Sequence, residues 1–278
     1  MIRIVTDSTS NMPPSWTEEY GIQVVPLQVM FGLETYKDGH LSNEEFYARL
    51  RTAPQLPTTS QPAVGDFYST YEKLTANGDQ VVSLHISSKL SGTYSNAAQA
   101  AAMFPEGAVT VLDTNWASIA LAFMAREAAR AAQAGKSVPD VVATAKALDP
   151  KLHLYLALET LENLRRGGRI GAAAAFIGGL LNFKPILSLR QGALQPVERP
   201  RSKKAAIRRM LEIVEGDIPK GAPIHCGILH AHAPVEMEEL TRQARERFNV
   251  VEVVNADVGP TIGTHVGEGT VGIICYPQ

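Results

Sequence analysis

Short apolar runs of strand length alternate along the chain with longer segments in which apolar residues recur at helical spacing. In the first half, the runs at 2–5, 22–31, 81–86 and 109–112 predict strands, and the segments between them carry helix start and stop signals. Parallel strands require long crossover connections, which are usually helices. The alternation therefore predicts an α/β domain over residues 1–150, with a mainly parallel sheet covered on both faces.

The pattern changes after Asp149-Pro150. Predicted strands at 152–158 and 224–230 are combined with a predicted hairpin around Gln191-Gly192 and further helices and strands toward the C-terminus. A hairpin joins antiparallel strands, so we expect residues 151–278 to form a second α/β domain with a mixed sheet.

Residues 87–93, with the sequence SSKLSGT, separate the predicted strand 81–86 from an alanine-rich helix over 94–103. Several hydroxyls and the first free N–H groups of a helix would then face one point, at the positive end of the helix dipole. This arrangement favours a negatively charged ligand. The alternative is that these are ordinary turn and N-cap residues.

A second hydroxyl cluster, PTTSQP at 57–62, also ends where a helix is predicted to begin, and Pro62 suits a first helical position. In parallel α/β sheets, ligands bind beyond the carboxyl ends of the strands, where the polar loops after Val5, Ile86 and Leu112 lie. We therefore expect two hydroxyl-rich loops to converge on one anion.

With 278 residues and 45% apolar content, the chain is long enough to fill a proper core. Its net charge of −2 shows no overall bias toward nucleic acid or membrane surfaces. The N-terminus has no secretory pattern, and the longest apolar stretch, 170–183, is shorter than the ~20 residues of a spanning helix. We expect a cytoplasmic protein without a membrane span.

Cys226 and Cys275 lie in separate apolar runs and form no CxxC pair, so we expect buried, reduced thiols. His230 and His232 would face the same way at a strand end, but no carboxylate or cysteine is spaced to complete a metal shell. We expect neither a metal nor a cofactor.

Residues 159–209 hold eleven Lys or Arg against three Glu, a local charge of +8. A solvated helix face explains part of this excess. The remainder indicates either an acidic partner that docks on the second domain or a negatively charged ligand. Nucleic acid is disfavoured, because Phe176 and Phe183 are the only aromatic residues in the segment.

His265 lies among glycines and threonines and has the chemistry to donate to an anion; the alternative is a histidine hydrogen-bonded in a turn. The following GEGTVG matches GxGxxG, but too few residues remain for a helix after it, so a dinucleotide site is rejected. Ser91 lacks a GxSxG or SxxK context. A serine hydrolase of a small ester, with Ser91 activated by His265, is the alternative function.

Five motifs in order, IVTDSTS (4–10), TTSQP (58–62), SSKLSGTY (87–94), LRRGGRI (164–170) and GTHVGEGTVGI (263–273), resemble the DegV family of bacterial fatty-acid-binding proteins. The resemblance covers essentially the whole chain. It implies two α/β domains with a long-chain fatty acid buried between them. Some members serve as the acyl-carrying B subunit of fatty acid kinase.

The resemblance also implies roles for individual residues. Thr59 and Ser91 would hydrogen-bond the carboxylate, with the backbone of Gly92 nearby, and His265 matches a histidine that joins them in some members. The protein would have no chemistry of its own. It would present the acid to a separate kinase subunit that makes the acyl phosphate from ATP, and Arg201 matches an arginine used toward that kinase.

The segment 170–183 is apolar on every side, and its glycines and alanines leave room for an acyl tail. Phe176, Ile177 and Leu180 are the candidates for lining that tail. The alternative is a fully buried core helix.

Overall fold

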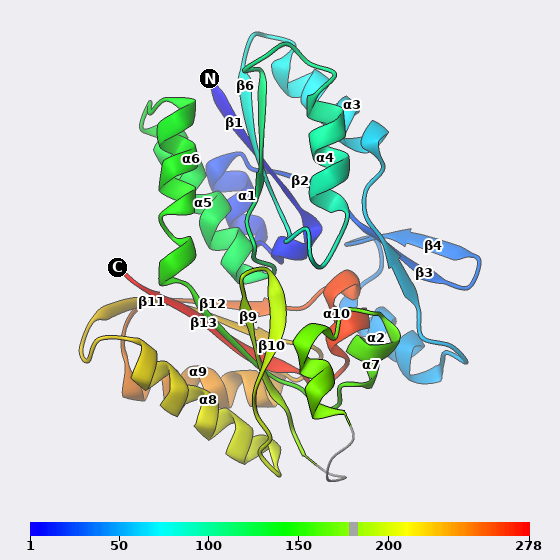
Figure 1. Ribbon diagram of the computed structural model, residues 1–278, viewed down its shortest axis with the longest axis vertical. Helices are drawn as coiled ribbons and strands as arrows, with labels where there is room; N and C mark the ends of the chain where they lie inside the picture. The colour runs from blue at the N-terminus through cyan, green and yellow to red at the C-terminus, as the bar shows by residue number, and fades with distance from the viewer. Residues whose placement is uncertain (178–182) are drawn as a thin grey trace. The chain divides into compact units, whose positions relative to one another are not determined.

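A computed structural model of the protein describes residues 1–177 and 183–278 (Figure 1). The chain forms two compact units. Unit 1 comprises Met1–His40 and Thr59–Pro150, and unit 2 comprises Leu41–Thr58 and Lys151–Gln278. The sequence indicated one boundary near residue 150. The structure divides the chain there, but it also places Leu41–Thr58 with the C-terminal part, so unit 2 is discontinuous in sequence.

Unit 1 is built on sheet A, whose four strands are all parallel and have the order β2-β1-β6-β7. These strands are β1 (Ile2–Asp7), β2 (Gln23–Val25), β6 (Gln80–His85) and β7 (Val109–Asp113). Helices cover both faces of the sheet (Figure 1), namely α1 (Pro14–Tyr20), α3 (Val64–Thr75), α4 (Thr93–Ala101), α5 (Ile119–Gln133) and α6 (Val138–Lys146). The predicted parallel α/β fold is confirmed.

The face of sheet A under α3 and α4 is closed by a tight apolar cluster. Its members come from three strands and both helices: Val5, Val25, Phe67, Tyr71, Val81, Ala97 and Ala100. The small alanines let α4 approach the sheet closely, which positions the first turn of α4 beside the end of β6.

The prediction of one strand over residues 22–31 is wrong, because the chain breaks at Pro26. Proline has no N–H for a strand ladder. The next residue, Leu27, donates its N–H to Ser8 Oγ at 3.0 Å and accepts the N–H of Asp38 at 2.8 Å. The following strand belongs to a separate three-stranded sheet B with the order β4-β3-β5. Its strands are β3 (Gln28–Phe31), β4 (Glu34–Lys37) and β5 (Thr58–Ser60).

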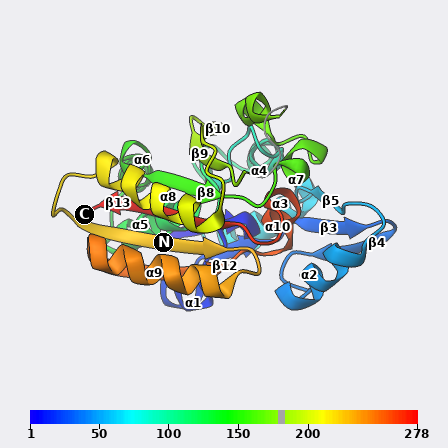
Figure 2. The same cartoon turned by 90° about the horizontal axis from the view of Figure 1, so that it is seen from below.

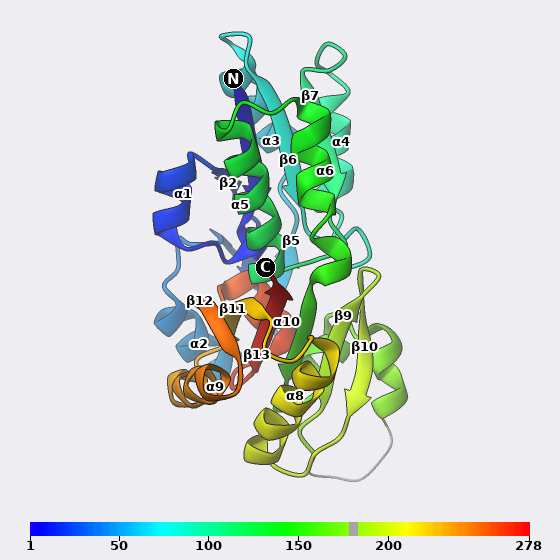
Figure 3. The same ribbon diagram turned by 90° about the vertical axis from the view of Figure 1, so that its left-hand side faces the viewer.

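Unit 2 contains sheet C, with the order β10-β9-β8-β13-β11-β12. Its strands are β8 (His153–Ala157), β9 (Ile186–Arg190), β10 (Ala193–Glu198), β11 (Pro223–His230), β12 (Asn249–Asp257) and β13 (Val271–Pro277). β11 and β12 are parallel and the other neighbours are antiparallel, which confirms the predicted mixed sheet. The β9–β10 hairpin, seen from the side in Figure 3, turns at Gln191 and Gly192 with φ of 50° and 80°, as expected for a type I′ turn.

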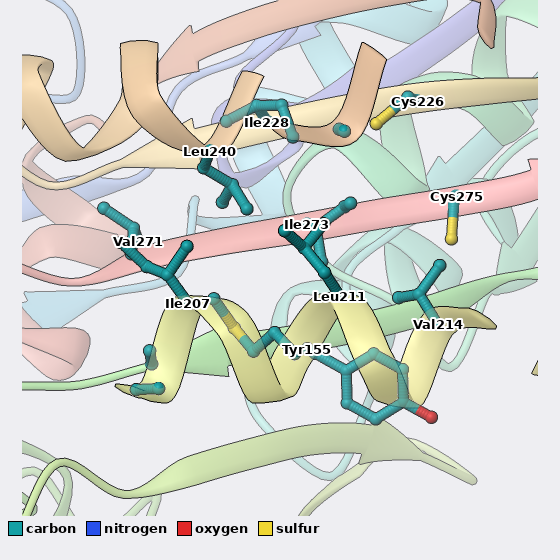
Figure 4. Packing of buried hydrophobic residues seen from close by; sticks show 14 of the residues in the cluster. Tyr155, Ile207, Leu211, Val214, Cys226, Ile228, Leu240, Val271, Ile273 and Cys275 are labelled. Atoms are coloured by element: carbon teal, nitrogen blue, oxygen red, sulfur yellow. The ribbon is translucent and has the colours of Figure 1, made fainter. Parts of the chain in front are cut away.

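Helices α8 (Lys203–Asp217) and α9 (Pro234–Arg247) pack on the same face of sheet C (Figure 2). Figure 4 shows this core, in which Ile207 and Leu211 of α8 and Leu240 of α9 meet residues of β11 and β13. Side chains alternate along a strand, so the opposite face of the sheet carries the intervening residues. These are also apolar and buried: Leu154, Leu156, Leu187, Leu189 and Ile274.

The remaining elements of unit 2 are short. α2 (Asn43–Thr52) begins with a capping box, in which the side chain of Ser42 accepts the N–H of Glu45 and the side chain of Glu45 accepts that of Ser42. α10 (Pro260–Val266) was not predicted, because its glycine and threonines weaken the helical signal. The others in unit 2 are α7 (Glu162–Arg166) and the 3-10 helix η3 (Gly171–Phe176). The 3-10 helix η1 (Ser8–Ser10) lies in unit 1, and η2 (Asp149–Lys151) spans the boundary between the two units.

Candidate functional site

The carboxyl ends of β1 and β6 are joined through Asp7, a carboxylate with no solvent exposure. Asp7 Oδ2 lies 3.0 Å from Nδ1 of His85 and accepts the N–H of Ile86 at 3.0 Å. Its other oxygen accepts the N–H of Thr9 at 3.0 Å and also the hydroxyl of Thr9. A buried charge is tolerated when it is paired and hydrogen-bonded, and these donors satisfy that condition.

The far nitrogen of His85 continues the network into the core. His85 Nε2 lies 2.7 Å from Ser83 Oγ, which accepts a hydrogen bond from Tyr71 OH at 2.9 Å. Because Tyr71 donates to Ser83, the serine hydroxyl donates to Nε2, and His85 donates from Nδ1 to Asp7. The sequence interpretation missed this hydrogen-bond network, although Ser83 and His85 lie at alternate positions of one strand and so face the same way.

Ser83, His85 and Asp7 have the order of side chains found in serine hydrolases. However, all three are completely buried, and the Ser83 hydroxyl is enclosed between Tyr71 and His85. A nucleophile must reach its substrate, so this triad is structural. It connects β6 to β1 at the point where the SSKLSGT loop begins.

That loop is held at both sides by backbone hydrogen bonds. Ser87 donates its N–H to the carbonyl of Trp116 at 2.9 Å, and Ser88 donates to Asp113 Oδ1 at 3.2 Å. Leu90 and Ser91 donate to the carbonyl of Ser87 at 2.9 and 3.1 Å. These hydrogen bonds anchor the loop to the ends of β6 and β7.

Ser91 leads directly into α4. Its Oγ accepts the N–H of Thr93 at 3.3 Å and lies 2.8 Å from the Thr93 hydroxyl. When Thr93 donates in both contacts, the proton of the Ser91 hydroxyl is available for an acceptor outside the loop. Within unit 1 the hydroxyl of Ser91 therefore contacts threonine rather than the histidine that a hydrolase requires.

The TTSQP segment meets the SSKLSGTY segment at Gly92, the N-cap of α4. A Cβ on Gly92 would lie 2.9 Å from Nε2 of Gln61. In addition, Asn96 donates its side-chain amide to the carbonyl of Pro62 at 2.8 Å. Thr59 is half-buried in β5, two residues before Gln61. The two segments therefore contact each other, whereas the convergence of their hydroxyls on one anion stays a prediction.

His265 lies in unit 2, in the last turn of α10, and is partly buried. Burial, with a smaller contribution from the nearby positive charge of Arg169, lowers the pKa of His265 to about 4. The ring is therefore neutral at pH 7, with one nitrogen as a donor and the other as an acceptor.

Much of the basic segment is neutralised within unit 2. Glu162 pairs with Arg165 and Arg166 at 2.7 and 2.6 Å. Likewise, Glu159 pairs with Lys184 and with Lys203. These pairs reduce the charge available to a partner, whereas Arg201 is exposed just before α8.

The segment 170–183 is only partly described. Its first part is the 3-10 helix η3, in which Ala172, Ala174 and Ala175 are exposed, so a fully buried core helix is wrong there. Phe176 is half-buried and packs edge-on against Phe183 with ring centroids 6.4 Å apart, and Ile177 is 48% exposed. Leu180 lies outside the described residues.

Within residues 1–177 and 183–278, no group of three or more His, Cys, Asp or Glu side chains is arranged to hold a metal ion. His230 Nδ1 instead accepts the N–H of Ala233 at 3.1 Å, and His232 stacks on Tyr47 with ring centroids 5.3 Å apart. None of the described helices has the length and apolar character needed to cross a bilayer.

Comparison with known proteins places the motifs in context. The family described as "uncharacterised protein, DegV family" matches residues 1–278 of this chain. The chain belongs to the DegV family. The curated protein DegV of Bacillus subtilis (strain 168) is 37% identical over 274 residues, which cover 98% of each chain.

Solved DegV structures share the fold. A DegV family protein from Thermus thermophilus, described by its fatty acid binding, superposes with a TM-score of 0.95 at 35% identity and covers 100% of this chain and 99% of its own. Bacillus subtilis DegV, described as a fatty acid binding protein, has a TM-score of 0.90 at 35% identity, with 100% and 99% coverage. Both of these solved DegV relatives are thus described by their binding of fatty acids.

Proposed function

We propose that this chain binds one long-chain fatty acid as a carrier in the cytoplasm and carries out no reaction on it. The observation that supports this most directly is the convergence of the TTSQP and SSKLSGTY segments at Gly92. Two hydroxyl-bearing loops and the start of a helix then offer donors at one place, which suits a carboxylate.

The head group requires these donors because a carboxylate loses its water on binding. In the proposal, Thr59 and Ser91 donate their hydroxyls and Gly92 its backbone N–H. The N–H groups in the first turn of α4 have no partner inside the helix and add to the positive potential. His265, as a neutral imidazole, is proposed to join as a further donor.

The tail supplies most of the affinity. At ~0.8 kcal/mol per buried CH₂, about 15 carbons contribute roughly 12 kcal/mol before the costs of association. Apolar side chains on the face of sheet C opposite α8 and α9 support this part of the proposal, since Leu156, Leu187 and Ile274 lie there. Phe176 and Ile177 are proposed to contact the tail as well.

The test is mass spectrometry of lipids extracted from the purified protein, followed by calorimetric titration of the delipidated protein with oleate. We expect a stoichiometric C14 to C18 acid. The variants Thr59→Ala and Ser91→Ala each remove a hydrogen bond to a charged group, so each lowers oleate affinity about tenfold. Ser95→Ala is the control, because Ser95 is an exposed serine on the same helix.

The hydrolase alternative makes a different prediction. A small ester would be turned over, and the turnover would be lost in Ser91→Ala. If this were seen and no fatty acid were extracted, the carrier proposal would be abandoned.

We further propose that the bound acid is presented to a separate kinase subunit that docks near Arg201. In an assay with such a kinase, ATP and oleate, Arg201→Ala is expected to slow acyl phosphate formation about tenfold, because the ion pair between Arg201 and the kinase is lost. The affinity for oleate itself should not change. Arg242→Ala in α9 is the control, since Arg242 is also exposed but pairs with Glu239 and Glu246. Equal rates for both variants would contradict docking at Arg201.

A further inference from the structure

Two consecutive glycines, Gly167 and Gly168, end α7 in the LRRGGRI motif, and they are needed for different reasons. Gly168 has φ of +72°, and its N–H and that of Arg169 bond to the carbonyls of Arg165 and Leu164 at 3.2 and 3.0 Å. This is a Schellman motif, in which the position of Gly168 favours glycine. Gly168 is thus explained by the helix end alone.

Gly167 has no such requirement. Its φ of −74° and ψ of −8° are open to any residue. Nevertheless, a Cβ on Gly167 would lie 2.4 Å from Nδ1 and 3.0 Å from Cε1 of His265. The space that a side chain would need is occupied by the imidazole ring.

Other contacts hold the C-terminal end of α7 against the segment around His265 in α10. Asn163 of α7 donates its amide to the carbonyl of Thr264 at 3.1 Å. Arg169 donates to the carbonyl of Gly167 at 2.7 Å, which holds the turn under the ring. A Cβ on Gly267 would lie 3.2 Å from Cγ of Asn163, so the chain after His265 also lies against α7. The imidazole has little freedom to retreat from an added methyl group.

The orientation of this ring has a functional consequence. A neutral imidazole has one donor and one acceptor nitrogen, and only the donor can stabilise a carboxylate. Rotation of the ring would exchange or displace these nitrogens. A residue that fixes the orientation therefore controls whether His265 can donate to the ligand.

We propose that Gly167 is a positioning residue for the fatty acid site: the absence of its side chain creates the space that holds the His265 ring in its binding orientation. This inference rests on the proposed role of His265 in carboxylate binding. It assigns to the LRRGGRI motif a task in ligand binding in addition to helix termination.

The test combines Gly167→Ala, His265→Ala and the double variant, with Gly216→Ala as the control. Gly216 lies in α8 of the same unit, and a Cβ there would meet no atom within 4 Å. Three quantities are measured: the ¹⁵N resonances of the His265 ring, the melting temperature and the affinity for oleate.

We expect Gly167→Ala to shift the ring resonances of His265, to lower the melting temperature and to weaken oleate binding about tenfold. In the His265→Ala background the same methyl group should have a much smaller effect on both melting temperature and affinity. The clashing ring is then gone, and the remaining close atom is the carbonyl oxygen of Asn163, 3.1 Å from the added Cβ. Gly216→Ala should leave the ring resonances unchanged.

The proposal is overturned if Gly167→Ala lowers the melting temperature equally in the wild-type and His265→Ala backgrounds. It is also overturned if Gly167→Ala leaves the ring resonances of His265 unchanged. It also fails if the resonances move and oleate affinity does not, provided that His265→Ala itself weakens oleate binding. If His265→Ala leaves oleate affinity unchanged, the proposed role of His265 has failed instead. If the Gly167→Ala protein does not fold, recovery of folding in the double variant still supports the contact between Gly167 and the His265 ring. A double variant that also fails to fold overturns the proposal.

Discussion

The side-chain amide of Gln61 occupies the position where a side chain on Gly92 would stand. The two residues come from the TTSQP and SSKLSGTY segments, and the ideal Cβ of Gly92 lies 2.9 Å from Nε2 of Gln61. Gly92 has φ of −73°, so its backbone does not require glycine. A side chain on Gly92 would therefore have to displace the Gln61 amide from this place beside the N-cap of α4.

This contact predicts the effect of Gly92→Ala. The added methyl group must displace Gln61 or the first turn of α4, so we expect oleate affinity, measured by calorimetry, to fall about tenfold, equivalent to ~1.4 kcal/mol. Gly65→Ala in α3 is the matched control, because a Cβ there meets no atom within 4 Å. Equal affinities for the two variants would contradict a ligand site at Gly92.

The buried Asp7 carboxylate predicts a large loss of stability on neutralisation. Asp7→Asn replaces an acceptor oxygen by an NH₂ group among the donors His85, Ile86 and Thr9. Leaving such buried groups unpaired should lower the free energy of unfolding, measured with urea, by ~3–5 kcal/mol.

Asp79→Asn serves as the comparison for Asp7. Its carboxylate pairs with the N-terminal amine of Met1 and with Arg3, whose side chains are 77% and 41% exposed, so solvent screens these ion pairs. We expect little change in its urea midpoint. If Asp7→Asn and Asp79→Asn lowered the free energy of unfolding equally, the buried hydrogen bonds of Asp7 would not stabilise the fold more than a solvent-screened ion pair does.

His265 predicts a pH dependence of stability. Its pKa is about 4 in the folded protein against an ordinary value of 6.5, so the unfolded chain binds the proton more tightly. The stability that the neutral ring contributes is present above pH 6.5 and is lost as the pH falls toward 4. His265→Gln should therefore show a shallower fall of urea-unfolding free energy over this range.

The same residue reports on the ligand. An NMR titration of the ring should give a pKa near 4 without fatty acid and a higher value with oleate bound, because a neighbouring carboxylate favours the imidazolium. An unchanged pKa would place the carboxylate away from His265.

Cys226 of β11 and Cys275 of β13 lie opposite each other in the strand register and have free thiols. Burial raises the pKa of Cys226 to about 12 and that of Cys275 well above its usual range. Only thiolates react readily, so a thiol reagent such as DTNB should label the native protein very slowly. Labelling should reach two thiols per chain on unfolding in guanidinium. Rapid native labelling would contradict the packing of this core.

The strands and helices were largely predictable because their signals are local. The apolar run at 81–86 indicates a strand from neighbouring residues alone, and the structure has β6 there. The hydroxyl clusters at 58–60 and 87–93 were equally visible, which is why the sequence already indicated a negatively charged ligand. The prediction of one continuous strand over 22–31 was wrong because it followed the apolar pattern and gave too little importance to the break at Pro26.

By itself, the sequence determined the α/β class, the two sheet types and the loops that carry the candidate donors, since hydrophobic period and turn chemistry depend on residues a few positions apart. Only the tertiary structure decided that Asp7 is hydrogen-bonded to His85, 78 positions away, and that Leu41–Thr58 belongs with unit 2. It also decided that Gly168 ends α7 whereas Gly167 leaves space for the His265 ring. These relationships depend on which distant side chains are packed into the same space. No local pattern in the chain encodes that choice, because it follows from the packing of each whole unit.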